Sequence, residues 1–243
     1  MALGWLTFKK GLYCALRPGL WRAMRVGVAP SIEHLEALRS RRLKTVVDIG
    51  ANRGQFTLLT RLLFPEASIF AFEPLSGPGE VFMRLFADDK AIKLRNVAIG
   101  DKAGVAQINV MSRDDSSSLL QPAALQTDIF GTDQSAVQTI AVQRLADVLD
   151  RSCLSGPALM KIDVQGFELE VLRGSSEMLD LFDVILVECS YVELYKGQAL
   201  ASDVVSWLAA RGFGLRGVFN QHIGAERGPI QADFVFEKTV EVS

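Results

Sequence analysis

Short apolar runs and amphipathic stretches alternate along most of the chain. The apolar runs are too short for buried helices and are rich in β-branched and aromatic residues, so they predict strands. The predicted strands cover residues 45–48, 67–72, 92–98, 158–163, 182–188, 213–219 and 233–237.

Amphipathic stretches separate these strands, with apolar residues at spacings of three or four, which is typical of helices that cover a sheet. We expect helices over residues 56–64, 79–88, 144–149, 169–178 and 201–211. Strands that alternate with helices form a mainly parallel α/β sheet. The loop 220–230 is too short for a helical crossover, so the last two strands should be antiparallel.

One long polar stretch interrupts the alternation. Residues 105–111 and 139–142 are expected to pair as a hairpin, and between them lies an insertion of about residues 112–138. An insertion of this length in a compact domain is usually either a functional lid or disordered.

The N-terminal residues carry a different pattern. Trp5, Phe8, Leu12 and Leu16 recur at spacings of three or four, on one face of a helix that Pro18 ends. A further helix should run from the N-cap Ser31 through Arg42, with His34 as a surface or packing residue. We therefore divide the chain into a helical leader, residues 1–42, and a catalytic domain, residues 43–243.

Charge is distributed unevenly between these parts. Residues 1–30 contain five Lys or Arg and no Asp or Glu, whereas the whole chain has a net charge of −2, so the remainder carries −7. We favour a leader whose helices cover the core or form a homodimer contact. The alternative is an interfacial helix, within residues 3–28, that rests on an anionic membrane. The overall charge does not suggest a nucleic-acid partner.

The location is inferred from what the chain lacks. Cys14, Cys153 and Cys189 have neither disulfide-framework nor zinc-site spacing, which suits a reducing cytoplasm. No apolar run approaches the roughly 20 residues that span a bilayer, and no secretory signal is recognisable. We expect a cytoplasmic protein, with the inner face of the membrane as the alternative location.

The segment 45–57 has the order strand, small-residue turn, helix, which nucleotide-like cofactors use. Gly50 and Gly54 permit close approach of the backbone to a ligand. Asn52 replaces the middle glycine of the dinucleotide fingerprint, which argues against a pyrophosphate. Asp48 would likewise repel a pyrophosphate but tolerate a sulfonium.

Later residues come to the same edge of the predicted sheet. Glu73 ends the second strand, where a carboxylate matches two vicinal ribose hydroxyls. Asn96 and Ala98 lie in the third turn and are candidates to border an adenine, although Asn before a turn is also ordinary turn chemistry. Asp163 ends the fourth strand.

Several motifs therefore occur in one order: residues 47–54, 72–74, 96–101, 116–118, 159–168 and 186–188. This set closely resembles the FkbM family of S-adenosylmethionine-dependent O-methyltransferases over roughly residues 45–238. The resemblance implies a class I, Rossmann-like sheet of seven strands in the order 3-2-1-4-5-7-6, with strand 7 antiparallel. It also implies S-adenosylmethionine as cofactor, S-adenosylhomocysteine as product and a hydroxyl as acceptor. Gln165 departs from the family, which commonly has Glu there.

The turns and the resemblance together give the candidate site. The candidate cofactor-binding residues are Asp48, Gly50, Ala51, Asn52, Gly54, Phe56, Thr57, Glu73, Pro74, Asn96, Val97, Ala98, Ser117 and Asp163. Removal of the hydroxyl proton needs a base near the methyl group.

Three residues are candidates for catalysis: Asp163, Glu188 and His222, the last in the loop after strand 213–219. Histidine suits proton transfer near neutral pH, although a packing role for this loop histidine is the alternative. A Mg²⁺ ion between Asp163 and Glu188 is an alternative that we do not favour.

We favour a sugar hydroxyl, in a glycan or glycolipid, as the acceptor. The polar insertion, with Tyr191 and Tyr195, would suit a sugar ring, unless these tyrosines only pack at the edge of the core. A polyketide or other small-molecule hydroxyl is the alternative. Two other classes of protein are alternatives: an NAD(P)-dependent oxidoreductase, which the missing glycine disfavours, and a non-catalytic nucleotide-binding scaffold.

Overall fold

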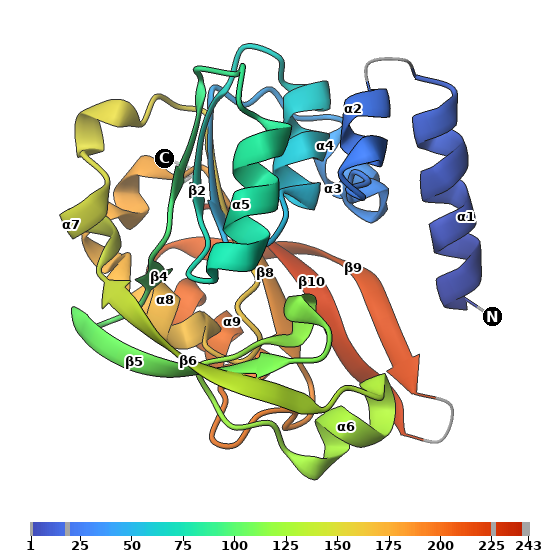
Figure 1. Cartoon of the computed structure of the whole chain (residues 1–243). Coiled ribbons are helices and arrows are strands. Elements are labelled where there is room, and N and C mark those ends of the chain that lie inside the picture. The colour runs from blue at the N-terminus through green and yellow to red at the C-terminus, as the bar shows by residue number, and fades with distance from the viewer. Residues whose placement is uncertain (1, 18–19, 225–226, 240–243) are drawn as a thin grey trace.

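The computed structural model describes residues 2–17, 20–224 and 227–239, and their side chains except those of residues 2–7 and 114. At its centre is a seven-stranded sheet whose strands follow the order β3-β2-β1-β7-β8-β10-β9 (Figure 1). This order and its antiparallel strand β10 confirm the class I methyltransferase topology expected from the sequence. The strands are β1 (Thr45–Ile49), β2 (Ser68–Phe72), β3 (Ile92–Arg95), β7 (Ala158–Ile162), β8 (Val184–Ser190), β9 (Phe213–Gly224) and β10 (Gly228–Lys238).

Helices cover both faces of this sheet. Side chains such as Val46, Leu159 and Leu186 meet α4 (Gln55–Leu63) and α5 (Ser76–Leu85) on one face. The other face is covered by α7 (Leu145–Val148), α8 (Glu168–Gly174) and α9 (Ala201–Ala209). Every residue of β1 is buried because it lies between two parallel neighbours and two helical layers. The carboxyl end of β1 is therefore a rigid position for a ligand site.

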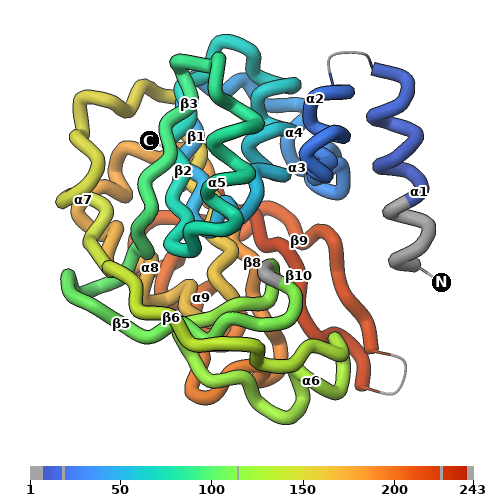
Figure 2. Tube along the Cα trace, viewed as in Figure 1, coloured from blue at the N-terminus to red at the C-terminus, as the bar shows by residue number. Residues whose placement is uncertain are grey.

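A small second sheet lies beside the carboxyl edge (Figure 2). It has the order β4-β6-β5, and its strands are β4 (Ala98–Ile99), β5 (Gly104–Met111) and β6 (Gln134–Gln143). The predicted pairing of residues 105–111 with 139–142 is confirmed. The expected single strand over residues 92–98 is wrong, because the chain leaves β2 after Arg95 and pairs Ala98 with Val142 of β6 instead.

The insertion at residues 112–138 is largely ordered into elements. It contains the 3₁₀ turn η3 (Asp114–Ser116), the helix α6 (Ala124–Phe130) and the first half of β6. Its apolar residues Leu120, Leu125 and Ile129 pack around Leu194 and Tyr195, which are both 1% exposed. Tyr195 is thus a core residue of this region, and its ring is not open to a sugar.

The leader is helical but differs in detail from the prediction. It contains α1 (Ala2–Ala15), α2 (Trp21–Arg25), the 3₁₀ turn η2 (Ile32–His34) and α3 (Leu35–Leu38). The expected helix from Ser31 through Arg42 is wrong: it is reduced to η2 and one α-helical turn, and Ser31 makes no capping side-chain hydrogen bond. Among the residues described, no helix is long and apolar enough to cross a membrane.

The face of α1 that packs against the core is not the face with the regularly spaced apolar residues. Cys14 is buried and contacts a cluster that includes Leu20, Leu58 and Leu85, while Phe8, Leu12 and Leu16 are exposed. The leader thus covers part of the core, as expected, but not through these three residues, for which a homodimer contact stays a prediction. The side chain of Trp5, the fourth member of the pattern, lies outside the described part of the chain.

The terminal hairpin is longer than predicted. Residues 220–230 were expected to form a loop, but β9 continues to Gly224 and β10 begins at Gly228. His222 is consequently a strand residue, paired with Gln231. Because β9 runs parallel to β8, this extension projects beyond the carboxyl edge of the sheet, where it can flank a ligand.

Candidate cofactor and acceptor site

The turn between β1 and α4 has three residues with positive φ: Gly50 at 78°, Asn52 at 47° and Gly54 at 93°. A Cβ on Gly50 would lie 1.8 Å from the carbonyl oxygen of Asp163. Only glycine fits there, because the ends of β1 and β7 approach each other closely. Gly54 begins α4 and packs against Phe82 and Phe86 rather than against a ligand.

A cavity opens at the carboxyl ends of β1, β2 and β7, where open α/β sheets bind ligands. Its wall is largely apolar, with polar groups at Asn52, Glu73 and Asp163. The lining residues are Ile49, Gly50, Asn52, Phe72, Glu73, Pro74, Leu75, Val97, Ala98, Ile99, Ile108, Asp115, Ser117, Leu119, Asp163, Val164, Gln165 and Phe167.

Glu73 is held rigidly at one end of this cavity. It is 6% exposed, its Oε2 accepts a hydrogen bond from the backbone N–H of Asn52 at 2.9 Å, and its Oε1 accepts one from Leu75 at 2.9 Å. Each carboxylate oxygen has a further lone pair. The side chain can therefore accept hydrogen bonds from two vicinal hydroxyls without losing its backbone partners.

A buried lysine links the first and fourth strands. Lys161 Nζ donates to the carbonyl oxygen of Gly50 at 2.9 Å, and lies 3.3 Å from Asp48 Oδ1 and 3.5 Å from Asp163 Oδ2. Burial by itself would lower the pKa of Lys161, but the charges of Asp163 and Asp48 outweigh it and raise the pKa. The lysine thus stays protonated, and Asp48, whose Oδ2 also accepts from Thr57 Oγ1 at 2.7 Å, is a structural charge beneath the turn.

Gln165 joins the two acidic residues at the edge of the sheet. Its Nε2 donates to Asp163 Oδ1 at 2.8 Å and to Glu188 Oε2 at 2.7 Å, while its Oε1 accepts from the hydroxyl of Tyr195 at 3.1 Å. The Ser118 hydroxyl, in the insertion, donates to the backbone oxygen of Gln165 at 2.5 Å. The insertion is therefore connected directly to the residue that holds both carboxylates.

Glu188 is half-buried at the end of β8, and both of its carboxylate oxygens accept hydrogen bonds from glutamine amides. Its other oxygen, Oε1, accepts from Gln231 Nε2 at 2.8 Å. Burial raises the pKa of Glu188 well above its usual range, and the negative charges of Asp163 and Asp233 raise it further. A carboxylate with a raised pKa is a stronger base, and is better matched to proton transfer near neutral pH than an ordinary glutamate.

A second charged pair lies next to Glu188. Asp233 is its partner across β10 and β8 and accepts from His34 at 3.0 Å and from Asn220 Nδ2 at 2.6 Å. Burial would lower the pKa of His34 and raise that of Asp233, but their mutual attraction outweighs it, so the pKa of His34 is raised and that of Asp233 is lowered. His34, expected to be a surface or packing residue, is thus a half-buried ion-pair partner that links the leader to the terminal hairpin.

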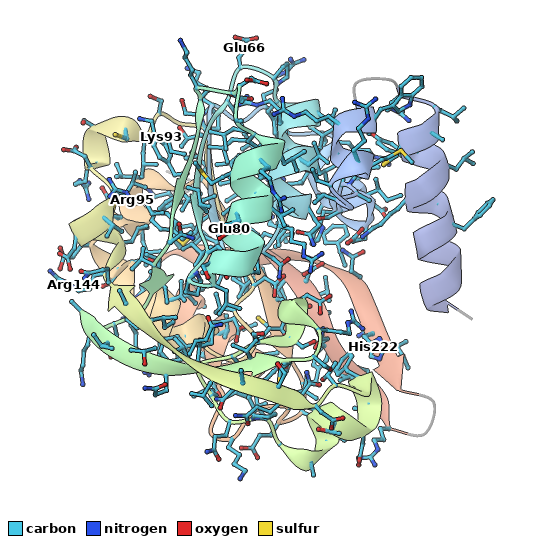
Figure 3. The ribbon with its side chains drawn as sticks, in the orientation of Figure 1. Glu66, Glu80, Lys93, Arg95, Arg144 and His222 are labelled. Carbon is cyan, nitrogen blue, oxygen red and sulfur yellow. The ribbon has the colours of Figure 1, made fainter. Side chains whose placement is uncertain are left out.

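His222 occupies a different place from the one expected. Its ring packs against Phe130 of α6, with centroids 5.2 Å apart, and Figure 3 shows it at the outer end of the hairpin. Three strand spacings separate β9 from β7, which is about 14 Å. The structure therefore does not bring His222 beside Asp163. Together with the approach of Arg227 to Asp128 at 3.9 Å, this packing joins the insertion to the hairpin.

The predicted cofactor residues separate into two groups. Those that line the cavity are Gly50, Asn52, Glu73, Pro74, Val97, Ala98, Ser117 and Asp163. The rest, which support the turn or the sheet beneath the cavity, are Asp48, Ala51, Gly54, Phe56, Thr57 and Asn96; the Asn96 amide, for example, donates to the backbone oxygen of Glu73 at 3.2 Å.

Sequence reasoning missed Lys161, Gln231 and Glu168. The signal for Lys161 was a charged residue inside an apolar strand, which demands a buried partner. Glu168 is 4% exposed, and its Oε1 accepts from the backbone N–H groups of Gly166 at 2.9 Å and Val164 at 3.4 Å. Burial raises its pKa to about 7. Within the described residues, no group of three His, Cys, Asp or Glu is arranged to hold a metal ion.

The residues present fit S-adenosylmethionine. Glu73 offers two acceptors for a ribose diol, the apolar wall at Leu75, Ile99 and Phe167 suits a purine, and acidic Asp163 suits the positive sulfonium end. The topology and this cavity define a class of protein, the S-adenosylmethionine-dependent methyltransferases with the class I fold.

Comparison with known proteins identifies the family. The chain matches the Methyltransferase FkbM domain over residues 48–215 and belongs to that family. This membership excludes the alternative of an NAD(P)-dependent oxidoreductase.

Individual relatives are distant. The chain is 28% identical over 160 residues to 2-O-methyltransferase NoeI of Sinorhizobium fredii (strain NBRC 101917 / NGR234), covering 63% of this chain and 66% of that one. It is 26% identical over 193 residues to 31-O-demethyl-FK506 methyltransferase FkbM of Streptomyces tacrolimicus, covering 69% and 72%. The match to the curated relatives spans from 63% to 73% of their own lengths.

The fold is also found in solved structures. The crystal structure of a putative rRNA-methylase from Clostridium thermocellum superposes with a TM-score of 0.50 at 13% identity, covering 85% of this chain and 93% of that one. At this identity, the similarity concerns the fold alone.

Proposed function

We propose that the protein transfers the methyl group of S-adenosylmethionine to a hydroxyl oxygen of a sugar. The observation that carries the proposal is one cavity that has Glu73 at one end and Asp163 and Gln165 at the other, with Glu188 behind them as a hydrogen-bond partner of Gln165. The first end suits a ribose, and the second offers acceptors for a hydroxyl that must lose its proton. Bound S-adenosylmethionine would supply the electrophilic methyl group.

Asp163 and Glu188 have different roles in the proposed reaction. Asp163 lines the cavity and is suited to position the acceptor or the cofactor. Glu188 would take the hydroxyl proton, so that the acceptor oxygen could bond to the methyl carbon that bound S-adenosylmethionine would supply, with S-adenosylhomocysteine as the leaving group. Glu188 is preferred as the base because of its raised pKa and its place beside Asp163. His222 is the second candidate and is better placed to contact a large acceptor.

The surroundings of Glu188 support a polyhydroxyl acceptor. The amides of Gln165 and Gln231 both bind Glu188, and Gln221 Nε2 lies 3.3 Å from the hydroxyl of Tyr191, which follows Glu188 by three residues. Side chains of this kind hydrogen-bond sugar hydroxyls and pack on sugar rings. The name of the relative NoeI, a 2-O-methyltransferase, agrees with transfer to oxygen. A polyketide hydroxyl is a second candidate because another relative is a 31-O-demethyl-FK506 methyltransferase.

Calorimetry with S-adenosylhomocysteine tests the cofactor end. Glu73→Ala should weaken binding on the order of 100-fold, because two hydrogen bonds to a charged group are lost. Glu66→Ala, at an exposed glutamate, is the matched control and should leave the affinity unchanged. Wild-type affinity in Glu73→Ala would refute the ribose assignment.

The acceptor end is tested by transfer of radiolabelled methyl from S-adenosylmethionine to panels of glycans and lipid-linked sugars, with polyketide alcohols in parallel. We expect label in an alkali-stable ether on a sugar. Label only in the polyketide panel would favour the second candidate, and tight S-adenosylhomocysteine binding without transfer to any hydroxyl would favour a non-catalytic protein.

A further inference from the structure

The first two helices expose an apolar surface. We call it the leader stripe: Phe8, Leu12, Leu16, Trp21 and Met24, whose exposed fractions are 61%, 50%, 70%, 52% and 46%. Phe8 and Leu12 are four residues apart in α1, and Leu16 follows four residues later, just beyond the end of α1. The Leu16 N–H still donates to the carbonyl oxygen of Leu12 at 3.2 Å, so all three lie on one side of the helix. The Trp21 indole N–H is 3.5 Å from the carbonyl oxygen of Ala15, so the stripe continues from α1 onto α2.

The opposite side of these helices already has its partners. Cys14, Leu20 and Ala23 are buried against residues of α4 and α5. Arg22 donates to Asp88 and to the backbone oxygen of Arg84, and Lys10 pairs with Glu33 at 2.9 Å. The leader is thus anchored to the domain through its inner side, and Figure 1 shows α1 along the outside of the molecule. The stripe faces away from the core.

Charge indicates what covers the stripe. The five basic residues within residues 1–30 have no acidic neighbour in that segment, and Arg17 and Arg25 are exposed beside the stripe. An apolar face bordered by cations matches a bilayer surface with anionic headgroups. A two-fold dimer through the same patch would bring the two cationic segments together, which like-charge repulsion disfavours.

We propose that α1 and α2 dock on a membrane surface that contains anionic lipid. The leader stripe enters the boundary between headgroups and acyl chains, with α1 lying in the plane of the interface, while the exposed cations contact lipid phosphates. This surface is independent of the methyl-transfer site, so it holds whichever acceptor is methylated.

Co-sedimentation of the full chain with vesicles of phosphatidylcholine and phosphatidylglycerol, at a ratio of about 7:3, tests the proposal. The wild-type protein should bind these vesicles and should bind vesicles of pure phosphatidylcholine much more weakly. Leu12→Ser/Leu16→Ser should weaken partitioning about tenfold because two apolar side chains are removed from the interface. Arg17→Ser/Arg25→Ser should weaken it about fivefold for each cation.

The matched control is Val105→Ser/Val137→Ser, which removes two side chains of similar exposure, 74% and 51%, from the small sheet. It should bind vesicles like the wild type. An unchanged thermal shift with S-adenosylhomocysteine would show that every variant is folded. The proposal is overturned if the wild-type protein does not bind the vesicles. It is also overturned if both leader variants bind them as tightly as the wild type. A wild-type dimer that Leu12→Ser/Leu16→Ser dissociates, without vesicle binding, would assign the stripe to a second copy instead.

Discussion

Replacing Glu168 with glutamine should remove a pH-dependent cost from the folded state. Glu168 lies at the start of α8, is 4% exposed, and its Oε1 accepts hydrogen bonds from the backbone N–H groups of Gly166 and Val164. Burial raises its pKa from 4.5 to about 7. Glutamine keeps an oxygen for the same two donors but carries no charge at any pH.

The magnitude follows from the difference between the two pKa values. The folded-state pKa is raised, so the folded protein binds the proton more tightly, and the stabilisation is complete below the unfolded pKa of about 4.5. It is lost as the pH rises through about 7. One pKa unit corresponds to about 1.4 kcal/mol, so the free energy of unfolding should fall by roughly 3 kcal/mol between pH 4.5 and 8 because of this group.

Urea unfolding followed by circular dichroism, at intervals from pH 5 to 8, measures the effect. We compare Glu168→Gln with the wild type at each pH, which cancels any constant loss of packing. The variant should gain relative stability by roughly 2–3 kcal/mol from pH 5 to 8. Glu66→Gln, at the exposed glutamate in Figure 3, is the control and should run parallel to the wild type. Parallel curves for Glu168→Gln would refute the reasoning.

Two further predictions concern the site. Gly50→Ala should destabilise the fold by about 3 kcal/mol or more, because Gly50 has a φ of 78° and its added Cβ would collide with the backbone oxygen of Asp163. Gly77→Ala, where nothing lies within 4 Å of the added Cβ, is the control in urea titrations. Similar unfolding midpoints for the two variants would contradict the close-approach argument. Glu188→Gln should lower kcat on the order of 100-fold or more with S-adenosylhomocysteine affinity unchanged, whereas His222→Asn should cost less than about tenfold. A larger loss for His222→Asn would make the histidine the base.

The parts of the site that the sequence predicts well are local. The local sequence of residues 45–57 is sufficient to predict their conformation: a β-branched run, glycines where φ is positive, and a helix that begins directly afterwards. Glu73 is found in the same way, since it ends a short apolar run. The strand order came from the family resemblance, because the sequence periodicity alone does not say which strands are neighbours.

What the sequence did not predict depends on distant partners. Residues 220–224 and 228–230 include Asn, Gln, Gly and Pro, which are poor strand formers, yet pairing across the hairpin extends both strands. Lys161 acquires its role from Asp48 as well as from its neighbour Asp163, and His34 acquires its role from Asp233; Asp48 and Asp233 lie far from their partners in the chain. In the leader, both faces of α1 contain apolar residues, so the period identifies a helix but not the side that packs.

The side-chain amide of Gln165 separates the carboxylates of Asp163 and Glu188. Its oxygen faces the Tyr195 hydroxyl, so both hydrogens of its NH₂ group are directed to carboxylates, one to Asp163 and one to Glu188. The bridge is neutral and does not titrate. It acts as a spacer that keeps the two acids from sharing a single proton between them, as adjoining carboxyl groups do. A proton that Glu188 takes from a substrate would therefore stay on Glu188 and not lie between the two acids.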